Sequence, residues 1–582
     1  MRSLACFFCI AGLGVAGDGK LAKDLPVTGA ARPIDVIIQF HNDLTPTQIS
    51  TWESKGRKFK KGLKLVRAAV YSVDSHSLAD LAKDPNVKYI SPDRVVRPTL
   101  DSAQVATGSL AAQQSGYNGE GVGIALLDSG VTDHWDLRAV GDDGYQANGN
   151  RVVYRESFVG GKSGASQDGF GHGTHVAGIL AGNGWSSSGN DYFQKVVGIA
   201  PKAGVISLQV LDEDGSGTDS AVIAAIQRSI ELKQRYNIRI LNLSLGRPVL
   251  ESFRTDPLCQ AVEAAWRAGI FVVVAAGNNG RDNTSGIQGY GTINSPANDP
   301  MVITVGAIKT YDTPSRADDQ MASYSSKGPT PIDHIVKPDI VAPGNRVASI
   351  LKDFHKGLAK QFPNNIVPFD LYSTSRARNL EAGATYFWLN GTSMAAPMVS
   401  GAAALMLQKD PTLTPDQLKA RLMKTASKNF PATSTGVDPA TGRQIIVQYD
   451  IFTVGAGYLD INAALASGDR FAGKALSPVA TLTTSGVRVI SAASAVWGDS
   501  AVWGDSAVWG DSAVWGDSTV WGDSTVWGDL VLRGDSAVWG DTAVWGNRSS
   551  SGFSVVWGDH SLAGSATQAT ALLSNVLIGG EK

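Results

Sequence analysis

The residues of this sequence that could do chemistry are a carboxylic acid, an imidazole, an amide and a hydroxyl, and they stand at Asp128, His172, Asn278 and Ser393. Ser393 lies within Asn390–Pro397, directly before a run rich in Ala, Val and Leu that predicts a buried helix. Thr392 or Ser393 is a suitable N-cap for that helix, and Pro397 is tolerated in a first helical turn. Because the positive end of a helix favours a developing oxyanion, this position suits a hydroxyl nucleophile.

The other three groups are those that a serine nucleophile requires. His172 has a glycine on each side, which allows close approach, and its imidazole could take the proton of the hydroxyl. Asp128 ends an apolar run and supplies an anion that can fix the tautomer of the imidazole. Asn278 follows Ala275–Gly277 and supplies an amide that can donate a hydrogen bond to a tetrahedral oxyanion. The four residues together predict nucleophilic attack on a carbonyl carbon.

Each of these residues also has a structural interpretation when it is taken alone. Gly-Thr-Ser is a common helix cap, a strand-end Asp often caps a helix, a lone His is usually structural, and an Asn after Gly is a turn residue. A lipase or esterase would need Gly-x-Ser-x-Gly, and Ala395 stands where the second Gly would be. A metal pair of His172 and His175 would need further ligands, and no Glu or Cys accompanies them in a zinc pattern. The combination favours acyl transfer, with His175 as a packed neighbour.

Short apolar runs alternate with helical segments from about residue 101 onward. Such runs are typical of parallel strands that are covered on both faces. The expected strands are Val122–Leu127, Val205–Val210, Ile238–Leu243, Ile270–Ala275 and Met301–Ile308, and the intervening helices include Ser220–Tyr236 and Leu258–Ala268. The alternation predicts an α/β fold with a doubly wound parallel sheet, whose site lies at the carboxyl ends of its strands. Asp128 and Asn278 both follow such ends.

These motifs resemble those of the subtilisin-like serine peptidases, the subtilase family, over roughly residues 105–465. The resemblance rests on Leu126–Gly130, His172–Gly178, Gly198–Pro201, Asn242–Gly246, Ala275–Asn278, Lys337–Gly344 and Gly391–Pro397. It implies a seven-stranded parallel sheet, a catalytic triad of Asp128, His172 and Ser393, and an oxyanion hole made by Asn278 and the backbone N–H of Ser393. The residues implied to contact the substrate and wall its main pocket are Ser244, Leu245, Gly246, Ala275, Ala276 and Gly277.

The implied pocket predicts the kind of substrate. Its side chains carry no charge that would recognise Lys or Arg, and its glycines leave room for a large group. We therefore expect protein or peptide substrates with an apolar or aromatic residue before the scissile bond.

The N-terminal part of the chain predicts export and processing. Residues 1–17 combine one early Arg, an apolar run and small residues, as in a cleaved secretory signal. Residues 33–98 predict a β-α-β-β-α-β unit that resembles the inhibitory propeptide of the family, with Asp84–Ile90 as its recognisable segment. Cleavage is expected near residues 97–105. The resulting zymogen would be secreted, with its own propeptide as an intramolecular inhibitor.

The C-terminal part has a different composition. We expect the peptidase domain to span 101–465, a linker 466–493, a hexapeptide repeat 494–560 and a tail 561–582. The repeat, Ser-Ala-Val-Trp-Gly-Asp, holds nine of the 14 Trp (497, 503, 509, 515, 521, 527, 539, 545 and 557). It could be a low-complexity Trp-Gly-Asp spacer, stack as a solenoid, bind carbohydrate or another surface polymer, or pair between chains. An alternative function is therefore a surface adhesin or scaffold that acts through the repeat, with the peptidase domain auxiliary.

Composition limits partners and cofactors. A net charge of −2 gives no argument for nucleic acid, and neither terminal apolar segment is long enough to predict a membrane span. Of the three Cys, Cys6 and Cys9 lie in the predicted signal, so Cys259 has no partner in the processed chain. No cofactor is required by the sequence. Calcium binding is left open rather than implied, because Asp136 matches a calcium ligand of some relatives but the loop 183–196 does not match theirs.

Overall fold

The computed structural model describes residues 20–22, 25, 33–93, 95–98, 106–140, 146–160, 167–192, 194–281, 289–311, 313, 315–373, 385–438, 442, 444–483, 486–490 and 531–532. The predicted signal, the predicted tail and all of the Trp repeat except Val531–Leu532 lie outside these residues. The chain forms two compact units, Met1–Asp93 and Arg94–Lys582. The domain boundaries expected from the sequence stay predictions.

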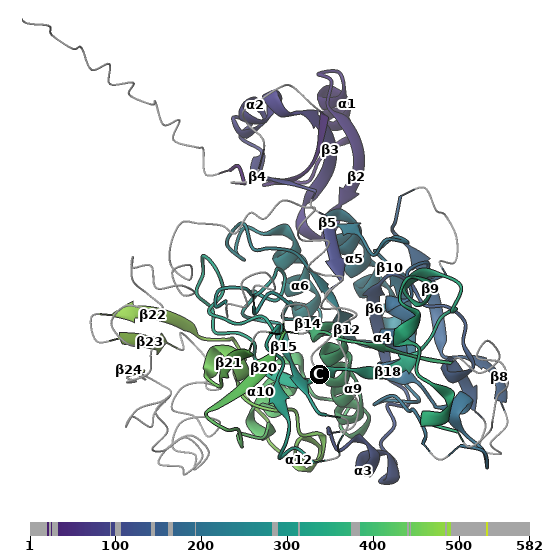
Figure 1. The fold of residues 1–582 in the computed structure, drawn as a ribbon. Coiled ribbons are helices and arrows are strands. Elements are labelled where there is room, and N and C mark those ends of the chain that lie inside the picture. The colour runs from purple at the N-terminus through teal and green to yellow at the C-terminus, as the bar shows by residue number, and fades with distance from the viewer. Residues whose placement is uncertain are drawn as a thin grey trace, which may run out of the picture. The chain divides into compact units, whose positions relative to one another are not determined.

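The first unit is a four-stranded antiparallel sheet with two helices (Figure 1). Along the chain its elements are β1 (Pro33–Phe40), α1 (Pro46–Glu53), β2 (Lys58–Leu63), β3 (Ala68–Asp74), α2 (Leu78–Ala82) and β4 (Val87–Pro92). A capping box starts α1, because the Thr45 hydroxyl accepts the N–H of Gln48 while the Gln48 side chain accepts the N–H of Thr45. Trp52 of α1 packs on Phe40 and Tyr71 of the sheet. The order of elements is the one that the sequence predicts.

The second unit is built on an eight-stranded, mostly parallel sheet in the order β16-β15-β14-β12-β6-β10-β9, with β17 paired to β15. Its strands are β6 (Gly123–Asp128), β9 (Val152–Ser157), β10 (Gly204–Gln209), β12 (Ile238–Leu243), β14 (Phe271–Ala275), β15 (Ile303–Lys309), β16 (Gln320–Met321) and β17 (Ile340–Asn345). The seven strands other than β16 pair in parallel. β16 pairs antiparallel to β15, so the expected purely parallel sheet is corrected to a mixed one. The chain returns to β15 through a short connection, which antiparallel neighbours permit.

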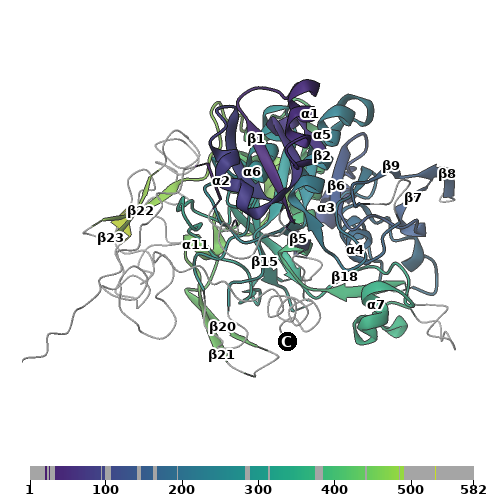
Figure 2. The ribbon, with the colours of Figure 1, turned by 90° about the horizontal axis from the view of Figure 1, so that it is seen from above.

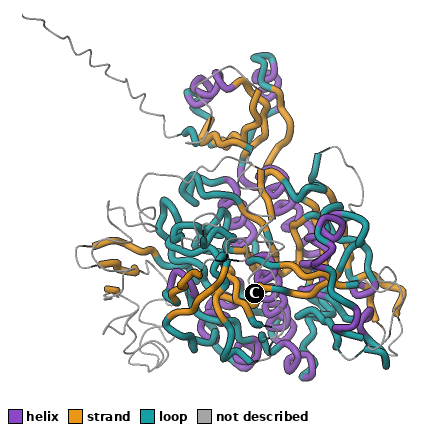
Figure 3. Tube along the Cα trace, viewed as in Figure 1, coloured by secondary structure: helices purple, strands orange, loops and turns teal. Residues whose placement is uncertain are grey.

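Helices cover both faces of this sheet, so the strands β6, β14, β15 and β17 are buried at every position. The helices are α3 (Ser109–Gln114), α4 (His172–Ala181), α5 (Asp219–Tyr236), α6 (Pro257–Arg267), α7 (Gly357–Gln361), α9 (Thr392–Lys409), α10 (Pro415–Thr425), α11 (Ile451–Val454) and α12 (Ile461–Ala466). Helix α9 contacts α4 and packs on the strands β12, β14, β15 and β17. Helices α5 and α6 contact each other. Figure 3 distinguishes the strands, in orange, from these helices, in purple.

A small three-stranded sheet, β11-β5-β13, also belongs to the second unit, and its middle strand β5 is labelled in Figure 1. The middle strand β5 (Val95–Pro98) runs antiparallel to β11 (Gly217–Thr218) and to β13 (Leu245–Gly246). Arg97 pairs with Gly246 and Pro98 with Leu245, while Val96 pairs with Gly217. We call the gap between β11 and β13 that β5 fills the strand slot.

The remaining strands form antiparallel pairs, some of which can be followed in Figure 2. They are β7 (Arg138–Val140) with β8 (Gln146–Asn150), β18 (Val347–Ile350) with β19 (Tyr386–Leu389), β20 (Thr433–Val437) with β21 (Gln444–Gln448), and β22 (Val479–Thr483) with β23 (Gly486–Ile490), to which β24 (Val531–Leu532) adds.

Part of the predicted linker packs on the rest of the second unit. Ser477 is buried, its hydroxyl bonds to Asp339, and Val479 pairs with Ile335. The ammonium of Lys419 lies in the same region, bonded to Ser477, to the backbone carbonyls of 300–302 and, at 3.3 Å, to Asp339. A Gly/Ala/Ser/Thr-rich composition predicts a flexible joint, but these buried polar contacts hold the segment in place.

No helix within the described ranges combines the length and the apolar character that crossing a membrane requires.

Candidate active site

Asp128 and His172 meet at the carboxyl edge of the central sheet. Asp128 ends β6 and His172 begins α4, and both side chains are fully buried. His172 Nδ1 lies 2.6 Å from Asp128 Oδ1, which also accepts the N–H of Ser129. Gly173 permits this approach, because a Cβ there would stand 2.1 Å from the carbonyl oxygen of Gly130. A carboxylate at Nδ1 directs the lone pair of the neutral imidazole to Nε2, the atom that a general base uses.

A second carboxylate, which the sequence reasoning missed, holds this pair in place. Asp168 is fully buried and accepts hydrogen bonds from the Ser129 hydroxyl, from the N–H of Gly171, and from the N–H and hydroxyl of Thr174. Ser129 in turn accepts the N–H of Gly173. Burial raises the pKa of Asp168 and these donors lower it, with burial the larger effect. The signal that could have found it is an Asp placed to cap the helix that His172 begins.

Ser393 is the second residue of α9, and its surroundings correct two expectations. The N-cap is Gly391, at φ 146°, rather than Thr392 or Ser393. Pro397 lies beyond the first turn and has no N–H to give to the carbonyl of Ser393, four residues earlier. The Ser244 hydroxyl donates to that carbonyl instead, at 2.8 Å, while Ser393 Oγ donates to the carbonyl of Ser244 at 3.0 Å. His172 Nε2 has no hydrogen-bond partner among the described residues.

Asn278 lies beside the start of α9. Its Oδ1 accepts the N–H of Thr392 at 3.2 Å and the Thr392 hydroxyl at 3.1 Å. The same hydroxyl accepts the N–H of Gly277. Thr392 is therefore used to orient Asn278 rather than to cap its own helix. Because Oδ1 faces Thr392, the N–H donors are at the opposite end of the amide.

The predicted substrate-contacting residues fall on two neighbouring elements. Ser244 precedes β13, which contains Leu245 and Gly246, and Ala275 ends β14, with Ala276 and Gly277 following. Asn294, which the sequence reasoning missed, packs against both glycines. A Cβ at Gly246 would lie 3.0 Å from the Cβ of Asn294, and one at Gly277 would lie 2.9 Å from its Nδ2. The space that the glycines leave is thus bounded by an amide.

His175 is packed inside the protein. Its Nε2 lies 3.2 Å from the carbonyl oxygen of Val347 and 2.9 Å from that of Phe387. Two acceptors at one nitrogen require that it carry the proton. Burial lowers the pKa of His175 to about 3, so the ring is neutral at ordinary pH.

The carboxylate of Asp136 is bound by donors of the protein. One oxygen accepts the N–H of Ser186 and the other accepts the Tyr386 hydroxyl, each at 2.8 Å. The guanidinium of Arg151 donates to the backbone carbonyl of Asp136. Among the described residues, no group of three or more His, Cys, Asp or Glu could hold a metal ion.

Comparisons with known proteins agree with this architecture. A model of the subtilase family matches residues 119–443. Serine protease AprX of Bacillus subtilis (strain 168) is 37% identical over 360 residues, which are 61% of this chain and 72% of that protein. Subtilisin E of the same organism is 33% identical over 377 residues, 64% of this chain and 79% of that protein.

A solved structure supports the fold independently. Fervidolysin from Fervidobacterium pennivorans, described as a keratinolytic enzyme related to subtilisin, matches with a TM-score of 0.53 and 20% identity. The match covers 78% of this chain and 64% of that one. With the family match over residues 119–443, the chain belongs to the subtilase family and is a subtilisin-like serine endopeptidase.

Proposed function

We propose that the chain is a secreted endopeptidase, made as a zymogen, in which Ser393, His172 and Asp128 form the catalytic triad and Asn278 supplies the oxyanion donor. The observation that carries the proposal is the buried 2.6 Å contact between Asp128 and His172 at the carboxyl edge of the sheet. Ser393, at the amino end of α9, is tied to the same edge through Ser244.

The reaction follows from these positions. Ser393 Oγ turns from the carbonyl of Ser244 to His172 Nε2, which takes its proton as Oγ attacks the substrate carbonyl carbon. Asp128 balances the charge of the imidazolium, and Asn278 donates to the oxygen that becomes negative. His172 then gives the proton to the leaving amine, and water hydrolyses the acyl-enzyme by the same steps.

The zymogen part of the proposal is supported by the occupant of the strand slot. The slot side of β13 is the edge along which a substrate is expected to run, and β5 pairs with it in antiparallel register. The register assigns Arg97 to Gly246 and Pro98 to Leu245. The described register ends at Pro98, opposite the residue that directly follows Ser244. We therefore expect self-cleavage near residues 97–105, followed by retention of the first unit as an inhibitor.

Substrate preference and export complete the proposal. The walls of the pocket are uncharged, so we propose an apolar or aromatic residue before the scissile bond, with Asn294 limiting the size that fits. Secretion rests on the signal-like residues 1–17.

The test is Ser393→Ala in the full chain. The variant should neither hydrolyse casein nor release its first unit, whereas the wild-type enzyme should yield a new N-terminus near residues 97–105 by mass spectrometry. Ser400→Ala is the matched control, because Ser400 is a buried serine of the same helix that donates to Asn242. A purified Ser393→Ala chain that still processes itself would refute the self-cleavage, and a new N-terminus far from residues 97–105 would refute the expected cleavage region.

A further inference from the structure

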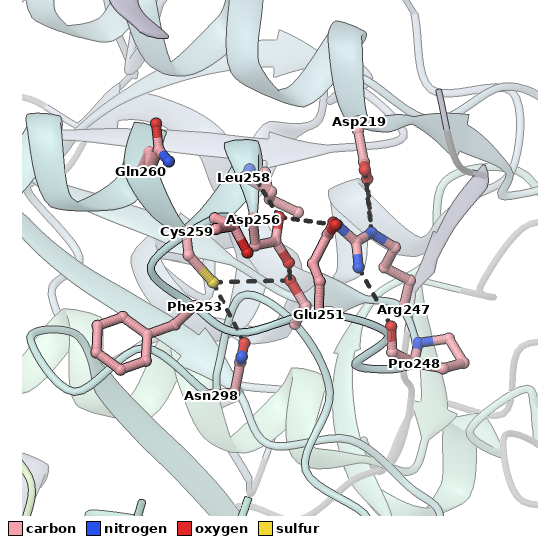
Figure 4. Close-up of polar contacts among 12 residues, drawn as sticks. Asp219, Arg247, Pro248, Glu251, Phe253, Asp256, Leu258, Cys259, Gln260 and Asn298 are labelled. Carbon is pink, nitrogen blue, oxygen red and sulfur yellow. Dashed lines mark hydrogen bonds and ion pairs between the residues drawn. The ribbon is translucent and has the colours of Figure 1, made fainter. Parts of the chain in front are cut away.

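Arg247 follows β13 directly, and its guanidinium is buried among carboxylates. The Arg247 side chain is 2% exposed. Its Nε lies 3.0 Å from each carboxylate oxygen of Asp219, and its Nη2 donates to Asp256 Oδ1 at 2.8 Å. A third carboxylate, that of Glu251, has an oxygen 3.8 Å from Nη2. Figure 4 shows Asp219 and Asp256 reaching this guanidinium from different elements.

The ion pair with Asp219 spans the strand slot. Asp219 is the first residue of α5 and directly follows β11, just as Arg247 directly follows β13. Neighbouring strands in a sheet are roughly 4.8 Å apart, so β11 and β13 stand roughly 10 Å apart on the two sides of β5. The pair joins the two walls at the end of the slot where β11 and β13 finish, opposite Val95–Arg97 and away from Ser393.

The other contacts of Arg247 fix its own position. Its backbone exchanges two hydrogen bonds with Ser295. Asp256, the N-cap of α6, accepts from the Ser295 hydroxyl as well as from Arg247. These contacts fix β13 to α6 and to the segment at Ser295. The ion pair between Arg247 and Asp219 then connects β13 to α5 on the other side of the slot.

Stability alone does not account for such an arrangement. Apolar side chains of similar volume often stabilise a fold as well as a buried ion pair does, because burying charges costs solvation energy. A planar guanidinium with several fixed N–H donors, however, sets the distance and angle between the groups it joins.

We propose that Arg247 and Asp219 are positioning residues that set the width of the strand slot, on which the hydrolysis of substrates with four or more residues before the scissile bond therefore depends. The inference rests on the proposed peptidase function and adds two positioning residues to it. Substrates too short to reach the Val95–Arg97 positions gain nothing from the pair. Longer ones form both ladders of backbone hydrogen bonds only when the walls stand at the right separation.

The test compares two substrates with the same residue before the scissile bond and the same leaving group, an N-succinyl tetrapeptide anilide and an N-acetyl single-residue anilide. In the processed full-length enzyme, Arg247→Met should lower the ratio of kcat/KM for the tetrapeptide to that for the single residue by about tenfold. Asp219→Asn, which keeps shape and one acceptor, should lower it by a smaller factor. Arg247→Lys should fall between wild type and Arg247→Met, because an ammonium cannot hold both carboxylates in a fork.

The matched control is Lys337→Met. Lys337 is fully buried and donates to Asp339 at 2.7 Å, before β17 and therefore at the opposite edge of the sheet. This variant should leave the ratio of kcat/KM unchanged. The comparison therefore distinguishes an effect of the slot width from an effect of losing any buried charge. If Arg247→Met does not fold, the ratio of kcat/KM measured for Asp219→Asn tests the proposal. An unchanged ratio in the folded variants, or an equal drop in the control, would overturn the proposal. A wild-type enzyme that hydrolyses neither substrate, with Ser393→Ala indistinguishable from it, would instead refute the proposed function.

Discussion

Asn278 is the residue whose contribution should grow during the reaction, because its amide meets a full negative charge only in the tetrahedral intermediate. Asn278→Ala should lower kcat by on the order of 100- to 1000-fold, about 3–4 kcal/mol, with KM little changed. Steady-state kinetics on a peptide anilide would measure both constants. Asn279→Ala, the neighbouring amide, should have little effect on either. A loss confined to KM would make Asn278 a ground-state binding residue.

Asn294 is the residue that should limit pocket size. Its side chain packs against Gly246 and Gly277. Asn294→Gly should therefore enlarge the pocket and raise the ratio of kcat/KM for Phe to that for Ala before the scissile bond, by about three- to tenfold. Cleavage of a peptide library by both enzymes would measure the change. A ratio that stays unchanged in Asn294→Gly would contradict this placement.

His175 should make the free energy of unfolding depend on pH in the acid range. The unfolded chain binds a proton at His175 near pH 6.5, but the folded chain binds it only near pH 3, because the ring is buried. Between these values the unfolded state holds more protons, so the free energy of unfolding should fall as the pH drops from 6.5 toward 3.

The substitution His175→Gln keeps a side-chain N–H for the two carbonyls but removes the titration. Urea unfolding at several pH values, in a Ser393→Ala background that prevents self-digestion, should show a shallower acid slope than in the His175 chain. Equal slopes would assign the acid sensitivity to other groups.

At the scale of elements, a hydrogen bond from Ser244, which precedes β13, to α9 depends on the presence of Pro397 in that helix. The proline leaves the Ser393 carbonyl without a helical partner, and the Ser244 hydroxyl replaces it. Ser244→Ala should cost about 1 kcal/mol of unfolding free energy. In a Pro397→Ala background the same change should cost less, because an alanine at that position can donate its own N–H. Thermal unfolding of the four proteins forms a double-mutant cycle, and strictly additive costs would contradict the compensation.

The buried strands of the sheet could be predicted because they are buried on both faces. β6, β10, β12, β14 and β15 read as mostly apolar runs, and the structure has them within one or two residues. β9 could not, because its sequence Val-Val-Tyr-Arg-Glu-Ser is that of a half-exposed edge strand. β16 has two residues and no periodicity to detect.

The site divides in the same way. Asp128, His172, Asn278 and Ser393 stand in local motifs whose residue types already suggest chemistry, so the sequence predicts them, and the structure brings them to one edge of the sheet; their roles stay predictions. Asp168, Arg247 and Asn294 act through partners far away in the chain, such as Ser129 for Asp168 and Asp219 for Arg247. A local sequence pattern cannot predict the role of a side chain when tertiary packing decides which residue it contacts.

At the scale of the molecule, the point at which the peptidase unit ends can be tested by two truncations. A chain ending at Gly473 loses Ser477, which bonds to Asp339 and Lys419, whereas a chain ending at Ala493 keeps it. The shorter chain should lose about 1–3 kcal/mol of stability because it leaves buried polar groups unpaired. Both should be compared by thermal unfolding in the Ser393→Ala background. Equal melting temperatures would mean that the segment after Gly473 adds nothing.

The chain ending at Ala493 also tests the Trp repeat. It should hydrolyse a soluble peptide within a few-fold of the full chain, because every predicted catalytic residue precedes residue 466. Nine Trp are costly to leave in water, so the full chain should bind cell-wall material or self-associate where the truncated chain does not. Kinetics, sedimentation and a pull-down measure the three properties. Collapse of peptide hydrolysis would place the repeat within the catalytic fold.

The Lys419 ammonium has a further consequence. With three backbone carbonyls, a hydroxyl and a carboxylate around it, this group fills the role of a bound cation in a cage of oxygens. A dissolved ion stabilises a protein by mass action, so its contribution falls on dilution and disappears with a chelator. A cation carried on a side chain has no concentration to lose. That corner of the fold is therefore indifferent to the mineral content of the surroundings and sensitive to pH instead, because burial lowers the pKa of Lys419 to about 7 and a rise in pH above that value removes the charge.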